Sequence, residues 1–167
     1  MRQHGRKDSD QWCSPRDVAE PLAQFFGGPV GCDPCSNANS IIVSEISYTW
    51  GGLHLPWRKP GSSNRTAYMN NPYSINVPWA GKALYEMRLG NVHELVTLMM
   101  VAPSTAWWSD LCRAPRNPRL LFTSRLRFIG DSSFGARFDT VLKYFGRRHR
   151  AFDREFQHIT RWTSWGR

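Results

Sequence analysis

The stretch AYMNNPYS, residues 67–74, holds the residues whose types and spacing most suggest chemistry. Asn70 places an amide side chain three residues before the aromatic ring of Tyr73, with Asn71 and Pro72 between them. An amide accepts and donates hydrogen bonds, and an aromatic face can hold a flat ring by stacking. The pair therefore suits a flat, amine-bearing ligand such as a nucleobase. Because Asn, Pro and Ser are also common turn formers, an ordinary loop is the alternative interpretation.

Strand and helix patterns along the chain predict the elements that would position this loop. The first predicted helix begins with Ser14 as N-cap and Pro15 in its first turn, and it ends before Gly27. The other predicted helices cover residues 79–89, 105–113 and 152–159. The predicted strands cover residues 29–32, 66–69, 94–101, 120–129 and 138–145, whereas residues 44–50 are predicted to be irregular.

This alternation predicts a single α/β domain with a mainly parallel central sheet flanked by helices. Ligands of such sheets bind at the carboxyl ends of the strands. Two loops fall there, namely DPCSNANS at residues 33–40 and NNPYS at residues 70–74. We expect a flexible, polar N-terminal segment over residues 1–11 and one domain over residues 12–167.

Composition favours a nucleic-acid partner. The formal net charge is +9 and the pI is about 10.0, a balance that favours a polyanion. A membrane surface is the competing polyanion, but no basic amphipathic helix with a long apolar face is visible. The longest apolar run, near residues 95–102, is far shorter than the roughly 20 residues of a membrane span. The charged N-terminus lacks the apolar core of a signal peptide, so we expect a cytoplasmic protein with reduced cysteines.

Five short segments follow one another along the chain. They are Trp12-Cys13-Ser14-Pro15, Asp33-Pro34-Cys35, Asn70-Asn71-Pro72-Tyr73-Ser74, Thr105-Ala106-Trp107-Trp108 and Arg125-Leu126-Arg127-Phe128. In this order they resemble the phage-encoded DNA adenine methyltransferases, the phage Dam family, over Trp12 to about Phe145. Ser14 stands for the family's threonine, and Asn71 for the first proline of Asn-Pro-Pro-Tyr. Gly51 stands where the family usually carries an acidic residue ahead of Gly-Leu.

The resemblance implies a Rossmann-like domain that transfers a methyl group from S-adenosylmethionine to the N6 amine of adenine in DNA. It assigns Asn70 as hydrogen-bond acceptor for that amine, the main-chain carbonyl of Asn71 as second acceptor, and Tyr73 as stacking platform, with Pro72 in the same loop. A register with the Asn71 side chain as acceptor is the weaker alternative. Since proline would stiffen this loop, we expect a slower site rather than an inactive one.

The resemblance also implies S-adenosylmethionine as cofactor. The implied cofactor-binding residues are Trp12, Ser14, Pro15, Asp33, Pro34 and Cys35. A loop after the first strand can offer main-chain N–H groups to a carboxylate, and Asp33 can accept from an ammonium or a ribose hydroxyl. An ordinary helix cap at Ser14-Pro15 is the alternative, and it is compatible with cofactor binding because a helix N-terminus favours a carboxylate.

Basic loops are the predicted DNA contacts, through phosphates rather than bases. They contain Arg58, Lys59, Arg65, Arg113, Arg116, Arg119, Arg147 and Arg148. A solvated basic surface is the alternative interpretation. Cys32 and Cys35 could begin a zinc motif, but no second pair completes four ligands, so we expect buried thiols and no metal. For Trp107 and Trp108 we expect core packing of at least one, with a wedge near an extruded base as the alternative.

Two other functions stay open at this point. The departures at Asn71 and Gly51 motivate a catalytically weak or inactive relative that binds nucleic acid. The same loop chemistry would also serve RNA or a protein glutamine, although the resemblance over most of the chain argues against this option.

Overall fold

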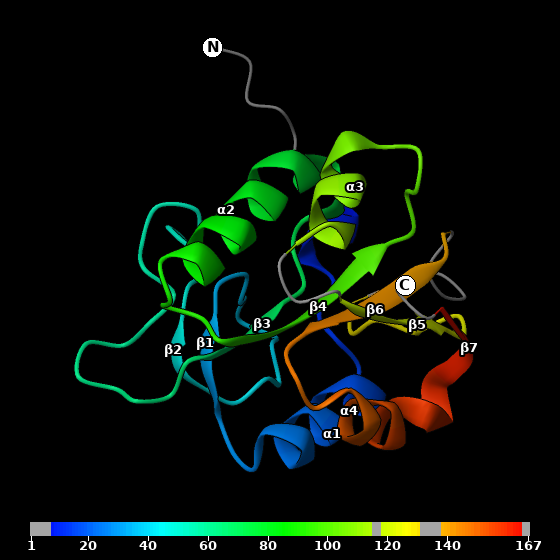
Figure 1. Cartoon of the computed structure of the whole chain (residues 1–167), viewed down its shortest axis with the longest axis horizontal. Coiled ribbons are helices and arrows are strands. Elements are labelled where there is room, and N and C mark those ends of the chain that lie inside the picture. The colour runs from blue at the N-terminus through cyan, green and yellow to red at the C-terminus, as the bar shows by residue number, and fades with distance from the viewer. Residues whose placement is uncertain (1–7, 115–117, 131–137, 165–167) are drawn as a thin grey trace.

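The computed structural model describes residues 8–114, 118–130 and 138–164. A seven-stranded sheet in the order β2-β1-β3-β4-β6-β5-β7 forms its centre (Figure 1). The strands are β1 (Val30–Asp33), β2 (Ser44–Ser47), β3 (Thr66–Met69), β4 (Glu94–Met100), β5 (Arg119–Thr123), β6 (Thr140–Phe145) and β7 (Thr160–Ser164). The helices are α1 (Arg16–Phe26), α2 (Asn76–Arg88), α3 (Ala106–Cys112) and α4 (His149–Phe156), with 3-10 turns η1 (Asp8–Gln11), η2 (Tyr73–Ile75) and η3 (Gln157–Ile159).

The sheet is mixed, which corrects the prediction of a mainly parallel sheet. Strands β2, β1, β3 and β4 run parallel, whereas β6, β5 and β7 join through antiparallel pairs. Helix α2 supplies the crossover that parallel pairing of β3 and β4 requires. The antiparallel half is hard to predict because a fully buried run, such as all six residues of β6, has the same pattern in either orientation.

Several element boundaries also differ from the predictions. Strand β3 forms over the predicted residues, but the strand predicted over residues 120–129 ends at Thr123. Strands β2 and β7 were not predicted. In β2 the half-buried and exposed positions alternate, and its Ser-Glu-Ile-Ser sequence carries only one apolar residue. A polar edge strand of this kind gives almost no hydrophobic signal.

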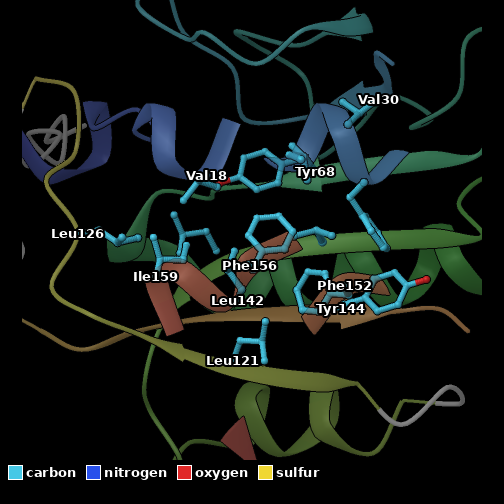
Figure 2. Packing of buried hydrophobic residues seen from close by; sticks show 14 of the residues in the cluster. Val18, Val30, Tyr68, Leu121, Leu126, Leu142, Tyr144, Phe152, Phe156 and Ile159 are labelled. Carbon is cyan, nitrogen blue, oxygen red and sulfur yellow. The ribbon is translucent and has the colours of Figure 1, made fainter. Parts of the chain in front are cut away.

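Helices cover both faces of the sheet, as predicted. Helices α1 and α4 pack together on one face, and α2 and α3 pack together on the other (Figure 1). Figure 2 shows the first face, where Val18 of α1 and Phe156 of α4 lie in one cluster with Leu142 of β6. Burying a side chain of this size stabilises the fold by roughly 1.5–3 kcal/mol. None of the helices in the described ranges is long and apolar enough to cross a membrane.

The start of α1 corrects another prediction. The N-cap is Pro15, and no side chain caps the helix. Ser14 is not the N-cap, because its hydroxyl pairs with the hydroxyl of Tyr68 in β3 at 2.6 Å. A contact between distant segments has thus taken the hydroxyl that local sequence would have assigned to the helix.

Candidate active site

Four parallel strands end together at one edge of the sheet, which we call the carboxyl edge. Their last residues are Asp33, Ser47, Met69 and Met100. The opposite edge is called the amino edge; β6 ends there because it runs antiparallel to β4. The two loops singled out by sequence, residues 33–40 and 70–74, both lie at the carboxyl edge.

Asn70 is held by two hydrogen bonds that determine which way its amide points. Its Nδ2 donates to the main-chain carbonyl of Trp12 at 3.2 Å, and its Oδ1 accepts from the Tyr73 hydroxyl at 2.9 Å. An amide oxygen has two lone pairs, so Oδ1 keeps one for another donor. The half-buried side chain lines a small cavity of about 10 Å³ together with Ser14 and Asp33.

Tyr73 contributes its hydroxyl to this arrangement rather than an open ring face. Its side chain is only 8% exposed, and its ring meets Phe128 and Phe138 edge-on, with centroids 6.1 and 5.0 Å apart. Burial raises the pKa of the phenol well above its ordinary value, so the hydroxyl stays protonated and remains a donor. Stacking of a base on Tyr73 stays a prediction, and it requires the ring to be uncovered.

Asn71, at the position of the missing proline, ties the loop down by hydrogen bonds. Its side chain is 2% exposed, and its Nδ2 donates to Oδ1 of Asn76 at 2.9 Å and to the carbonyl of Pro72 at 3.0 Å. Asn76 in turn donates to the carbonyl of Tyr73 at 2.7 Å. This chain of amides joins the loop to the start of α2. Among the described residues, Oδ1 of Asn71 is buried without a partner.

Ser74 links the same loop to the N-terminal part of the chain. Its main-chain N–H and its hydroxyl donate to the two carboxylate oxygens of Asp10, at 3.2 and 2.7 Å. Asp10 lies within the segment predicted to be flexible, whose residues 1–7 fall outside the described part of the chain. The predicted boundary at residue 12 stays a prediction.

Asp33 ends β1 as a buried carboxylate, only 3% exposed. Its oxygens accept from the main-chain N–H of Cys35 at 3.2 Å and from the Ser40 hydroxyl at 3.3 Å, which shapes the loop that follows. Burial raises the pKa of this carboxyl to about 6 in spite of these hydrogen bonds. At neutral pH the group is mainly ionised, and its charge faces the small cavity beside Asn70.

A groove of about 980 Å³ lies beside the small cavity. Its lining comes mainly from residues 34–38 after β1, residues 48–54 after β2, and Pro72, Ser74, Ile75 and Trp79. Cys35 and Asn37 line both spaces, so groove and cavity are neighbours. The volume reaches the upper end of the roughly 300–1,000 Å³ that small-molecule sites occupy.

The wall after β2 is the part of the site that sequence reasoning largely missed. A Cβ at Gly52 would lie 2.0 Å from the carbonyl oxygen of Pro34, so only glycine fits against the loop after β1. The carbonyl of Gly52 accepts from Nε1 of the fully buried Trp57 at 2.6 Å, which fixes the turn. Trp50 stands at the groove with 78% of its surface exposed. A tryptophan followed by two glycines was the signal that could have found this wall.

A comparison with known families bears on this arrangement. A family model described as DNA N-6-adenine-methyltransferase (Dam) matches residues 3–143. The chain belongs to this family. Membership confirms the resemblance found in the sequence, and at the level of the family it supports methylation of adenine N6 in DNA. No curated protein matches the sequence.

The backbone conformation at Gly51 explains why glycine is accepted where the Dam family pattern has an acidic residue. Gly51 has φ of +84°, and its carbonyl accepts from the main-chain N–H groups of His54 and Leu55 at 2.7 and 2.8 Å. Among residues other than glycine, Asp is one of the few that tolerate a positive φ. Glycine therefore keeps the turn, and what is lost is a carboxylate at position 51 itself.

The residues predicted to bind the cofactor gather at the carboxyl edge. Trp12, Ser14, Asp33 and Cys35 line the small cavity, Pro34 and Cys35 line the groove, and Pro15 begins α1 next to them. The ring of Trp12 stacks on Phe128 with centroids 5.5 Å apart. The structure thus brings these residues together, and their contact with a cofactor stays a prediction.

Most of the predicted DNA-binding residues lie at the other end of the sheet. Arg65 and Arg119 stand where β3 and β5 begin, Arg147 and Arg148 follow the end of β6, and Arg113 follows α3. Arg58 and Lys59 lie in the loop that leads to β3, and Arg116 is outside the described residues. The direction of the strands therefore places these strand-end arginines at the amino edge, where β3 and β5 begin and β6 ends.

Several of these arginines have structural partners. Arg119 is 5% exposed and binds the carboxylate of Asp153 in α4 through two hydrogen bonds of 2.7 Å. Arg148 binds Oε2 of Glu94 at 2.9 and 3.0 Å. Arg65 donates to the carbonyl of Gly90. Contact of this set with DNA stays a prediction.

The cysteine pair and the tryptophan pair both lie in or near the core. Cys32 and Cys35 are free thiols, and burial raises the pKa of each. Within the described ranges, no three His, Cys, Asp or Glu side chains group closely enough to hold a metal ion. Trp107 and Trp108 are 8% and 7% exposed, which confirms their core packing, and Nζ of Lys143 lies 3.3 Å from the ring centroid of Trp108.

Proposed function

We propose that this protein transfers a methyl group from S-adenosylmethionine to the N6 amine of adenine in DNA, with Asn70 accepting hydrogen bonds from the reacting amine. The observation that carries the proposal is the oriented amide of Asn70 at the carboxyl edge, beside a groove of about 980 Å³. Family membership supports the reaction, and this geometry supports the assignment of the residue.

The lining of the groove fits the methyl donor, which supplies an activated methyl group on a positively charged sulfur. Asp33, in the adjoining small cavity, offers negative charge for an ammonium, and residues 36–38 offer main-chain N–H groups for a carboxylate. Trp50 and Trp79 offer aromatic surface for a purine ring. In the described part of the chain, Nε1 of Trp79 is a buried donor without a partner, which leaves hydrogen-bonding capacity in this wall.

Asn70 addresses the chemical difficulty of the reaction. The N6 lone pair of adenine is delocalised into the ring, so the amine is a poor nucleophile. Oδ1 of Asn70 and the main-chain carbonyl of Asn71 accept from the two N6–H groups and favour a tetrahedral nitrogen. The N–C bond then forms as the C–S bond breaks, and a proton leaves the nitrogen for water. The base has to leave the duplex stack before it can reach this edge.

The carbonyl of Trp12 and the hydroxyl of Tyr73 hold the Asn70 amide in place before the substrate arrives. Such preorganisation matters because no reorientation is then needed as the bond forms. The hydroxyl of Tyr73 occupies one lone pair of Oδ1 and leaves the other for the amine.

Methyl transfer from labelled S-adenosylmethionine to adenine-containing DNA tests the proposal. We expect transfer by the wild type and at least a roughly 100-fold loss in Asn70→Ala, by analogy with the removal of other preorganised polar groups. Tyr73→Phe should lose less, because it removes only the orienting hydroxyl. Calorimetry should show that both variants still bind the methyl donor.

A folded wild-type protein that methylates no adenine-containing DNA would contradict the proposal and favour a nucleic-acid-binding relative without activity. Full activity in Asn70→Ala would contradict the assigned residue while leaving the reaction in place. Mapping modified adenines in DNA from cells that express the protein would identify the target sequence.

A further inference from the structure

We infer that Arg125 and Arg127 form a phosphate-binding surface that holds the DNA backbone against the carboxyl edge. The inference rests on the proposed function and deepens it, because it places the substrate on the molecule. Neither arginine belongs to the basic set that sequence analysis assigned to DNA.

The two arginines lie at the same edge of the sheet as Asn70. Strand β5 begins opposite Tyr144 of β6 and reaches Val141 by Phe122, so it runs toward the carboxyl edge. Residues 124–130 leave the sheet there. Arg119, at the start of the same strand, lies at the opposite edge. One short strand thus separates a structural arginine from the proposed pair.

The segment that carries the pair is fixed at both ends. The main-chain N–H of Ser124 donates to the carbonyl of Ile159 at 2.8 Å. Ile129 and Cys13 exchange two main-chain hydrogen bonds, of 2.9 and 3.0 Å. The second contact joins this segment to the residue that follows Trp12. A fixed backbone limits the conformational entropy that DNA binding would otherwise cost.

Side chains along the segment alternate between inside and outside. Leu126 and Phe128 are each 4% exposed, whereas Arg125 and Arg127 are exposed. Figure 2 shows Leu126 at the end of the core cluster that contains Ile159. In an extended chain, residues two apart lie about 6.6 Å from each other on the same side. The two guanidinium groups therefore project on the same side of an anchored backbone segment and can bind separate phosphates.

The anchoring side chain connects the pair to the candidate active site. The ring of Phe128 stacks on Trp12 and meets the ring of Tyr73 edge-on. Trp12 and Tyr73 are the two residues that hold the Asn70 amide. A DNA backbone bound at Arg127 would therefore lie next to Phe128, whose ring supports the two residues that hold the Asn70 amide.

Charge pairing separates these arginines from the two paired arginines at the amino edge. Over the described residues, Arg125 and Arg127 have no ion-pair partner, whereas Arg119 and Arg148 bind Asp153 and Glu94. An arginine already bound to a carboxylate has two of its five N–H donors occupied and its charge neutralised. An unpaired guanidinium keeps its fork of N–H groups, which matches the oxygens of a phosphate.

Fluorescence anisotropy with a short labelled duplex, recorded at increasing salt and without methyl donor, tests the inference. We expect Arg125→Ala/Arg127→Ala to weaken binding on the order of tenfold or more, since hydrogen bonds to charged groups are the strong ones. The slope of log affinity against log salt should shrink by about 1.8, because each phosphate contact contributes about 0.9. Arg125→Lys/Arg127→Lys should keep most of the slope, because the charges remain.

Arg88→Ala/Arg150→Ala is the matched control, since it removes two exposed arginines from α2 and α4. We expect near wild-type affinity and slope from it. Equal losses in the two double-alanine variants, or a larger loss in Arg58→Ala/Arg147→Ala, would overturn the inference. A wild type that binds the duplex through Arg125 and Arg127 but does not methylate it would support the inference and contradict the proposed function alone.

Discussion

The two edges of the central sheet use charged and polar groups in opposite ways. At the amino edge the buried arginine is paired, through the two hydrogen bonds between Arg119 and Asp153. At the carboxyl edge Asp33 is buried and accepts hydrogen bonds, but no described residue forms an ion pair with it. Oδ1 of Asn71 is buried there without a partner among the described residues. The buried charge is thus paired at the amino edge, whereas the buried charge at the carboxyl edge has no counter-ion among the described residues.

This difference indicates which groups serve stability and which serve a ligand. Unpaired buried polar groups cost free energy, so a fold keeps few of them, and those it keeps tend to mark functional sites. Net charge alone does not make this distinction. The charge of +9 combines arginines that hold elements together with arginines that have no partner in the described chain.

The largest expected effect concerns the amino edge. Arg119→Ala leaves the carboxylate of Asp153 without its partner, and we expect the free energy of unfolding to fall by about 3 kcal/mol, the lower end for buried pairs because Asp153 is 30% exposed. Urea denaturation measures the loss. Methylation by the folded fraction should not change.

Arg16→Ala serves as the control for this measurement. Its ion pair with Glu20 joins side chains that are 80% and 64% exposed, so its loss should change stability little. An equal effect of the two substitutions would show that pairing at the amino edge is not what stabilises the domain there.

Sequence reasoning predicted the carboxyl-edge loops better than the charge distribution. Asn70 and Asp33 could be placed because each follows a short apolar strand, and parallel strands bring such positions to one edge. The arginines could not be placed, because their edge depends on the direction of β5 and β6, which a buried pattern does not encode. The wall at Gly52 was missed since it depends on a close approach to Pro34, a contact between segments distant in sequence.

A second prediction concerns the pH dependence that the carboxyl edge adds to stability. The pKa of Asp33 is about 6 in the fold, against an ordinary 3.8. Between these values the folded state binds a proton that the unfolded state releases, so the free energy of unfolding falls as pH rises through this window. The loss is nearly complete one unit above the higher value, at about pH 7, and it amounts to roughly 2–3 kcal/mol.

Asp33→Asn removes this ionisation. We expect the variant to be more stable than the wild type at pH 7 by roughly that amount, with the advantage vanishing below the ordinary pKa of 3.8. Denaturation at several pH values measures the difference, and calorimetry should show weaker binding of S-adenosylmethionine. A stability difference that does not depend on pH would show that the charge of Asp33 does not destabilise the carboxyl edge.

The smallest expected effect compares two asparagines in similar hydrogen-bond networks at opposite edges. Asn76→Ala breaks the amide chain between Asn71 and Tyr73, and Asn64→Ala breaks contacts with Pro29 and Thr66 before β3. Each substitution should lower the free energy of unfolding by about 1 kcal/mol, the usual net contribution of such bonds. Only Asn76→Ala should also slow methylation by the folded protein, by a few-fold, because Tyr73 orients the Asn70 amide. If both variants methylated at the wild-type rate per folded molecule, the amide chain would stabilise the loop without positioning the reacting group.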